Sequence, residues 1–208
     1  MSDQSPSDSL GNFADLVAAG TPTPGGGSVS AYCGVLAASL GQMVCSITIS
    51  KPKYASVESR LKEIKSELVR LGARLRELIA EDAASFEAVL GAYRLPKETD
   101  EQKSDRAASI QKAIQGAIDA PFETARRSFE VLKLLGELAG IGTPTALSDV
   151  AVAAQLAQAA IRGAFYNVCV NLDSMANREA AGNTRKEIEA LVHQAVTMSE
   201  QVSARMKL

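Results

Sequence analysis

The sequence predicts an all-α protein, an array of long and closely packed helices, and three observations support this fold class. Hydrophobic residues make up 46% of the 208 residues and charged residues 22%, which is typical of a folded globular chain. Only 4% are aromatic and there is no Trp, so the core must be aliphatic, which suits packed helices better than a β-sandwich. Apolar residues recur at helical spacing, and no segment alternates as a half-buried strand does.

The chain has the length of one domain, and neither a linker nor a fixed-period repeat divides it. We therefore expect a flexible polar N-terminal arm at residues 1–11 and one helical domain at residues 12–208. The arm lacks the basic and apolar pattern of a secretory leader. Cys33, Cys45 and Cys169 are widely spaced in apolar helical stretches, as in reduced cytoplasmic proteins, so a cytoplasmic location is expected.

Charge and composition exclude several classes of function. A net charge of −2 lacks the basic footprint of a sequence-independent DNA binder, so no nucleic-acid partner is expected. One histidine, His193, and the lack of C-x-x-C pairs argue against a zinc site, and no metal is expected. The charge-free run at residues 29–50 is long enough to span a bilayer. Its polar residues favour instead a helix buried in a soluble core, and no membrane partner is expected.

The first predicted helix is short and contains Phe13. The turn Thr21–Ser28 (TPTPGGGS) ends it, because two prolines and three glycines cannot continue a helix. Ser28 is the expected N-cap of a second helix that runs to Ile49. Small residues spaced 3, 4, 3 and 4 apart on one face of this helix allow close approach of another helix: Ala31, Gly34, Ala38, Gly41 and Cys45. The rest of the helix is uncharged and needs cover on most sides, which predicts a homodimer whose partner supplies part of the wall.

The third predicted helix, at residues 56–93, is the most regular. Its apolar residues form a heptad seam of Val57, Leu61, Ile64, Leu68, Leu71, Leu75 and Leu78. Such a seam predicts long helices packed side by side.

The later helices are marked by their ends. Thr99–Gln102 (TDEQ) reads as a capping box that opens a fourth helix, and Pro121 interrupts that helix or opens a fifth. After a loop at 140–145, Ser148 and Asp149 open a long apolar helix that runs to about Leu172. A polar helix at 183–207 ends the chain.

Asp82 occupies the next position of the seam, where the pattern requires an apolar side chain. The apolar stripe then resumes at Phe86, Val89 and Tyr93. Burial of an ionised carboxylate is costly unless it is paired, and desolvation raises its pKa toward the range that a general acid or base needs. A structural Asp that caps or pairs with a neighbouring helix fits the pattern equally well. Glu81, one residue off the seam, is expected to be solvated.

Three other groups are compatible with binding or with a purely structural role. Gly25–Gly27 at a helix start can expose N–H groups to an anion or make a tight turn. Lys51 and Lys53 can complement the dipole of the second helix or hold an anionic ligand. Ser148 and Asp149 can cap their helix or belong to a site.

Asn167 and Asn171 lie four residues apart, on one face of a buried helix. Buried amides need partners. These two can bond across a subunit seam, which we favour, or to a polar heterocycle.

Taken together and in order, seven motifs resemble the formiminotetrahydrofolate cyclodeaminase / methenyltetrahydrofolate cyclohydrolase family. They are PTPGGGS, MVCSIT, KPKY, EDAASF, LPKETDEQK, SDVAVAA and NVCVNL, between about Asn12 and Met175. The resemblance implies an all-α homodimer that acts on the one-carbon unit bridging N5 and N10 of tetrahydrofolate. It implies no cofactor beyond the folate substrate.

The resemblance also assigns site residues. Asp82 falls on the presumed catalytic Asp of the family, in the same D-x-x-x-F setting with Phe86. The substrate-binding residues implied or suspected are Pro24, Gly25, Gly26, Gly27, Ser28, Lys51, Lys53, Tyr54, Phe86, Ser148, Asp149 and Asn167. Two departures from the family pattern are Pro52, which interrupts a run of lysines, and Thr143, where the family usually has Asn.

The expected activity is that of a methenyltetrahydrofolate cyclohydrolase, because VLGAYRLPKETDEQK looks closer to the stand-alone cyclohydrolases. Formiminotetrahydrofolate cyclodeaminase is the alternative, and a non-catalytic folate-binding or scaffold dimer of the same fold is a further one. Lys51 and Lys53 are candidates for the glutamate carboxylates of polyglutamylated folates.

Overall fold

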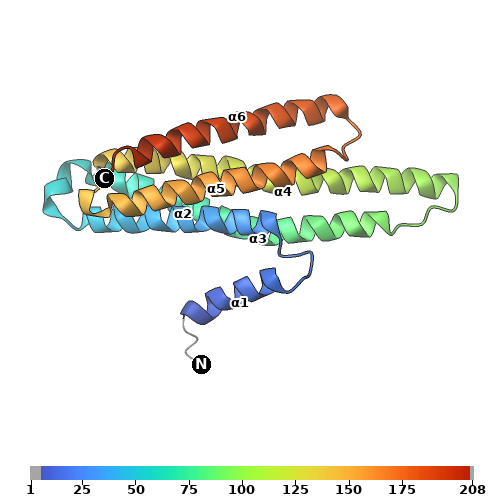
Figure 1. Ribbon diagram of the computed structural model, residues 1–208, viewed down its shortest axis with the longest axis horizontal. Coiled ribbons are helices and arrows are strands. Elements are labelled where there is room, and N and C mark those ends of the chain that lie inside the picture. Colours follow the sequence, from blue (N-terminus) through green and yellow to red (C-terminus); the bar gives the residue numbers. More distant parts are fainter. Residues whose placement is uncertain (1–5, 207–208) are drawn as a thin grey trace.

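The structure, a computed structural model, describes residues 6–206 and is helical throughout that range, apart from turns, which confirms the all-α class. Figure 1 shows the α-helices in chain order. They are α1 (Pro6–Ala18), α2 (Gly26–Ile49), α3 (Glu58–Tyr93), α4 (Asp100–Ile141), α5 (Leu147–Leu172) and α6 (Arg178–Ser203). Short 3₁₀ helices at Pro52–Val57 and Pro144–Ala146 join α2 to α3 and α4 to α5.

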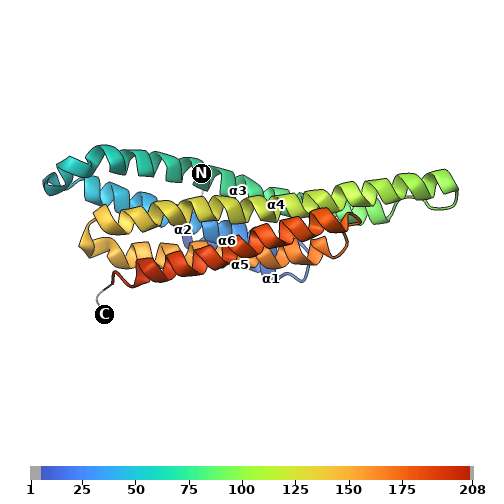
Figure 2. The same cartoon turned by 90° about the horizontal axis from the view of Figure 1, so that it is seen from above.

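Helices α2 to α5 form the core of the bundle, and α6 packs on α4 and α5. Helix α1 lies beside the bundle (Figure 1). Its Phe13 ring packs against the ring of Tyr32 in α2, with the ring centroids 5.2 Å apart. At one end, the last turns of α3 and the first turns of α4 project together beyond the other helices (Figures 1 and 2).

The heptad seam of α3 is the spine of the core. From Leu61 to Leu78 its side chains are at most 1% exposed. The small residues of α2 permit the close approach that the sequence predicts. A Cβ on Gly34 would lie 2.7 Å from Ser128 Oγ, and one on Gly41 would lie 2.7 Å from Leu68 Cδ1. Glycine at these positions therefore allows α2 to reach α3 and α4.

Helix α2 is also long and apolar enough to cross a bilayer. Its most apolar stretch of 18 residues has a mean hydropathy of 1.5, and 44% of that stretch is buried within this chain. Core helices of water-soluble bundles meet the same criteria, and α2 packs against α3, α4 and α5.

The N-terminal boundaries of two helices differ from the prediction. Residues 6–11, expected in the arm, are helical within α1, and residues 1–5 lie outside the described range. Ser28 does not cap α2: the N-cap is Gly25, and the Ser28 hydroxyl bonds to α3 instead.

Further along the chain, Pro121 neither interrupts nor opens a helix, because α4 continues through it for 42 residues in all. The N-cap of α5 is Ala146, so Ser148 lies in the first turn and does not cap.

Helix α6 begins at Arg178, earlier than predicted, because Asn177 Oδ1 caps it by accepting from Ala180 N at 3.0 Å. The capping box at Thr99 and Gln102 is confirmed.

Candidate active site

A cleft of about 220 Å³ opens where the N-terminus of α2 meets α3, α4 and α5. Its lining residues are Pro22, Thr23, Gly25, Gly26, Gly27, Asp82, Ser85, Phe86, Val89, Ala117, Asn167 and Asn171. Asp82 is the one charged residue among them. A larger hollow, of about 500 Å³ between α2 and α3, contains none of the residues that the sequence singled out as site candidates.

Asp82 lies against the first turn of α2. Ser28 Oγ donates a hydrogen bond to Asp82 Oδ2 at 2.9 Å. Gly27 is packed so closely that a Cβ there would lie 2.5 Å from Asp82 Cγ. The glycine turn and the seam carboxylate, 54 residues apart in sequence, therefore form one unit. Asp82 thus contacts a neighbouring helix, as a structural role requires, and also lines the cleft, where a general acid or base would have to lie.

The surroundings of Asp82 shift the pKa of its carboxyl upward. Burial raises the pKa of the carboxyl above its ordinary value, while the hydrogen bonds from the Ser28 side chain and backbone act in the opposite direction. Among the residues with described side chains, no cation forms an ion pair with Asp82. A half-buried carboxyl with a raised pKa is suited to accept and return a proton.

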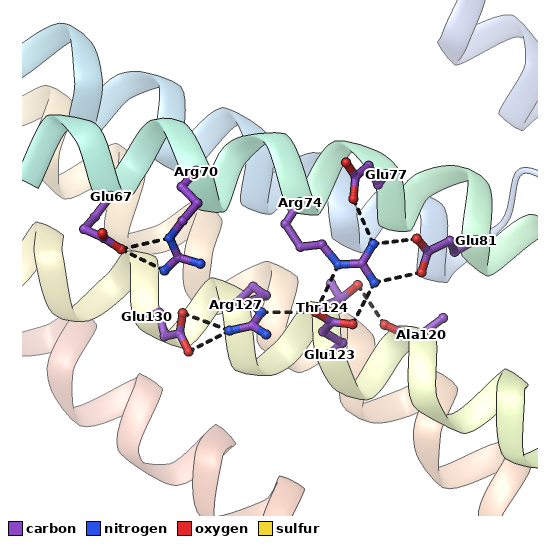
Figure 3. Close-up of polar contacts among 10 residues, drawn as sticks. All are labelled: Glu67, Arg70, Arg74, Glu77, Glu81, Ala120, Glu123, Thr124, Arg127 and Glu130. Carbon is purple, nitrogen blue, oxygen red and sulfur yellow. Dashed lines mark hydrogen bonds and ion pairs between the residues drawn. The ribbon is translucent and has the colours of Figure 1, made fainter.

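Glu81, the next residue along the chain, is exposed as predicted, and it also forms an ion pair. Figure 3 shows its carboxylate on Arg74, with Nη1 to Oε1 at 2.5 Å. Arg74 Nη2 also donates to Glu123 Oε2 of α4 at 2.8 Å, and Arg127 adds a bond to Glu123. These ion pairs join α3 to α4 beside Asp82. The sequence pattern did not reveal them, although Arg74 and Glu81 lie seven residues apart, on the same face of a helix.

Five of the predicted residues lie instead at the opposite end of the bundle: Lys51, Lys53, Tyr54, Ser148 and Asp149. Lys51 Nζ donates to Thr143 Oγ1 at 2.9 Å and to Thr145 Oγ1 at 3.2 Å. Lys53 Nζ lies 4.9 Å from the centre of the Tyr54 ring. A hydrogen bond with Thr143 is the main cause that lowers the pKa of Tyr54, and Lys53 and Lys51 lower it further.

Ser148 and Asp149 lie in the first turn of α5, at this same end. The segment just before α5 is held there because Thr143 N donates to Thr48 Oγ1 at the end of α2. We call Lys51, Lys53, Tyr54, Thr143, Ser148 and Asp149 the lysine cluster. The 24 residues of α2 separate it from Asp82 by about 36 Å, at 1.5 Å per residue. Within one chain the predicted site is therefore divided in two. Pro24 lies in the turn before α2 and does not line the cleft.

The two asparagines of α5 both line the cleft, and within this chain their side-chain NH₂ groups bond to backbone carbonyls. Asn167 Nδ2 donates to Gly163 O at 2.9 Å. Asn171 Nδ2 donates to Ala117 O at 3.0 Å and to Asn167 O at 2.9 Å. All these acceptors belong to the same chain. Asn171, Ser85 and Val89 join the site as residues that were not assigned to it from the sequence.

Comparisons with known proteins show which family the chain is similar to. The family model described as Formiminotransferase-cyclodeaminase matches residues 9–190. The methenyltetrahydrofolate cyclohydrolase of Methylorubrum extorquens is 40% identical over 200 residues, which is 96% of each chain. The formimidoyltransferase-cyclodeaminase of Rattus norvegicus is 33% identical over 191 residues, 92% of this chain and 35% of that protein.

A solved structure has the same fold. The crystal structure of formiminotetrahydrofolate cyclodeaminase from Thermotoga maritima aligns with a TM-score of 0.82 and 27% identity, and the alignment covers 95% of both chains. The chain therefore belongs to the formiminotransferase-cyclodeaminase family.

Proposed function

We propose that this chain is a methenyltetrahydrofolate cyclohydrolase, which converts 5,10-methenyltetrahydrofolate and water to 10-formyltetrahydrofolate. The observation that carries the proposal is a cleft whose one charged lining residue is Asp82, a carboxyl whose pKa burial raises. Identity of 40% along the whole length of a methenyltetrahydrofolate cyclohydrolase supports the choice of reaction. The substrate brings its own electrophile, a delocalised amidinium cation, and a single carboxylate in an otherwise uncharged cleft suits such a cation.

Asp82 is the proposed proton carrier. Water attacks the bridging carbon of the cation, and the carboxylate takes a proton from that water. The carboxyl then returns the proton to N5 as the bond between N5 and the bridging carbon breaks. The hydroxyl oxygen on that carbon forms the formyl C=O as its own proton passes to the carboxylate and then to solvent. Ser28 Oγ keeps the carboxylate in place, and Phe86 and Val89 supply an apolar wall for the ring system. No cofactor beyond the folate is needed for these steps.

Formiminotetrahydrofolate cyclodeaminase is the second candidate, because the Thermotoga maritima structure carries that name. In that reaction N10 attacks the 5-formimino carbon, and Asp82 would protonate the departing ammonia. Two assays on the wild-type protein distinguish the candidates. The proposal predicts decay of methenyltetrahydrofolate absorbance faster than in buffer. Ammonia release from 5-formiminotetrahydrofolate alone would make it a cyclodeaminase, and no turnover of either substrate would indicate the non-catalytic alternative.

We propose further that the protein acts as a homodimer in which two chains complete each site. Helix α2 has no charged residue, yet Leu36, Met43 and Ile47 are 36%, 38% and 38% exposed on it. A second copy can cover this stripe. If a two-fold axis runs beside the middle of α2 and perpendicular to it, the two α2 helices run antiparallel. The lysine cluster of one subunit then lies near the Asp82 cleft of the other.

In this arrangement Lys51 and Lys53 bind the glutamate carboxylates of the folate. No ion pair engages either lysine among the residues with described side chains. We expect Lys51→Glu/Lys53→Glu to raise KM for polyglutamylated substrate with little change in kcat, because the tail lies far from the reacting carbon. Lys186→Glu, an exposed change on α6, is the control and should leave KM unchanged. An unchanged KM in the double variant would contradict the assignment.

A heterodimer tests whether the site is shared. One chain carries Asp82→Asn and the other carries Lys51→Glu/Lys53→Glu, with two tags for purification. If each site takes Asp82 from one chain and the lysines from the other, one site of the heterodimer carries all the substitutions and the other carries none. The heterodimer should then show about half the wild-type activity at low substrate. Activity no higher than the mean of the two variant homodimers would place each site within one chain.

A further inference from the structure

Pro121 leaves a free backbone carbonyl on the wall of the cleft. In an α-helix the N–H of residue 121 bonds to the carbonyl of residue 117, and proline has no N–H. Ala117 lines the cleft and is only 7% exposed. A buried carbonyl without a donor is costly, so this one needs a partner from another element.

Asn171 of α5 is that partner. Its Nδ2 donates to Ala117 O at 3.0 Å and to Asn167 O at 2.9 Å. A carboxamide nitrogen carries two hydrogens, and both are committed to backbone carbonyls. The amide therefore has one orientation, with its NH₂ group toward α4 and the backbone of α5. The side-chain oxygen faces away from both carbonyls.

The Asn171 oxygen is an unused acceptor in the cleft. Among the residues with described side chains, no donor bonds to this oxygen. The oxygen is also not fully buried, so it is accessible. Asn167 repeats the arrangement one turn earlier, with Nδ2 on Gly163 O and its oxygen also without a donor among the described residues. The α5 wall thus presents neutral acceptors, while Asp82 faces the cleft from α3.

We propose that Asn171 Oδ1 accepts a hydrogen bond from the 2-amino group of the bound pterin, and that Pro121 positions it by freeing the Ala117 carbonyl. This inference rests on the proposed function, which supplies a folate as the ligand. The 2-amino edge of a pterin is a neutral donor, so a neutral acceptor matches it. The single carboxylate is then left for the one-carbon bridge.

The proposal predicts discrimination between two substrates. One is 5,10-methenyltetrahydrofolate, and the other is its analogue with a methyl group in place of the 2-amino group. The analogue leaves the Asn171 oxygen unpaired, and an unmet hydrogen bond in a binding site costs about tenfold or more in kcat/KM. Asn171→Leu removes the acceptor, so the preference should fall to about twofold or less.

Two further variants separate recognition from structure. Gln111→Leu is the matched control: Gln111 is also a carboxamide, on α4, that bonds to the segment after α5, at Ser174 O and Ala176 N, and it does not line the cleft. It should keep the wild-type preference. In Pro121→Ala/Asn171→Leu, the backbone N–H of residue 121 can bond to Ala117 O. That carbonyl is then satisfied, although the Asn171 oxygen is missing from the cleft. We expect this double variant to unfold at a higher temperature than Asn171→Leu and still to lack the preference.

The measurement is kcat/KM for both substrates with each protein, together with thermal unfolding. Loss of the preference in both Asn171 variants, and not in Gln111→Leu, supports the proposal. A wild-type preference that survives Asn171→Leu or returns in the double variant overturns it, because Asn171 would then be structural only. Absence of turnover in the wild type would instead overturn the proposed function and this inference with it.

Discussion

Asp82→Asn is expected to lower kcat for the hydrolysis of methenyltetrahydrofolate by about 10²–10⁴-fold, the usual contribution of general acid–base catalysis. Asparagine keeps the shape of the side chain and can accept from Ser28 Oγ, but it cannot carry a proton. The measurement is the initial rate of absorbance decay at saturating substrate. Glu81→Gln is the matched control, since Glu81 is adjacent and bonds to Arg74 outside the cleft. It should keep kcat within about threefold, because exposed ion pairs contribute little.

Asp82→Asn should not lose stability at neutral pH. Burial raises the pKa of Asp82 in the folded state above its unfolded value, so the wild type loses stability as pH rises through these pKa values. The neutral amide that replaces the carboxyl resembles its protonated form at every pH. Thermal unfolding should therefore show a variant at least as stable as the wild type at pH 7, with the difference closing in acid. A variant that is inactive because it unfolds would contradict this account.

Gly27→Ala is the second change with a large expected effect. The new Cβ would lie 2.5 Å from Asp82 Cγ, a distance that side chains do not tolerate. The carboxylate is short and bonded to Ser28, so either Asp82 or the first turn of α2 must move. A forced shift of this kind costs about 1–3 kcal/mol, and displacement of Asp82 should reduce kcat by at least about tenfold.

Gly91→Ala is the control for that experiment. Gly91 lies on the same helix as Asp82, and a Cβ there meets nothing within 4 Å. Alanine is the better helix former by about 0.5–1 kcal/mol, so this variant should gain stability and keep its kcat. If kcat and thermal unfolding of Gly27→Ala match those of the wild type, the contact between the glycine turn and Asp82 is not required.

The sequence singled out the residue at the centre of the candidate site because regular periodicity exposes an exception. Leu75 and Leu78 follow the heptad spacing, so the carboxylate at position 82 stands out, and the structure places it where α2 begins. Periodicity does not reveal which helices are neighbours. It therefore could not decide whether the glycine turn or the pair Ser148 and Asp149 lies beside Asp82.

The remaining errors have local causes. Pro121 was expected to break a helix, since it removes a hydrogen bond, but Asn171 from α5 supplies the missing donor. That compensation depends on the register between α4 and α5, which no single segment encodes. The separation of the lysine cluster from Asp82 could have been predicted from the sequence, because a helix of 24 residues must separate its two ends by about 36 Å.

The pH dependence of methenyltetrahydrofolate hydrolysis tests the central claim most directly. A carboxylate that takes a proton from water must be ionised, and burial raises the pKa of Asp82. We therefore predict that kcat/KM, corrected for the buffer reaction, falls toward acid pH through a pKa above the ordinary value of an aspartate, and that Asp82→Asn lacks this acid limb. A wild-type rate equal to the buffer rate at every pH, or the same acid limb in Asp82→Asn, would contradict the account.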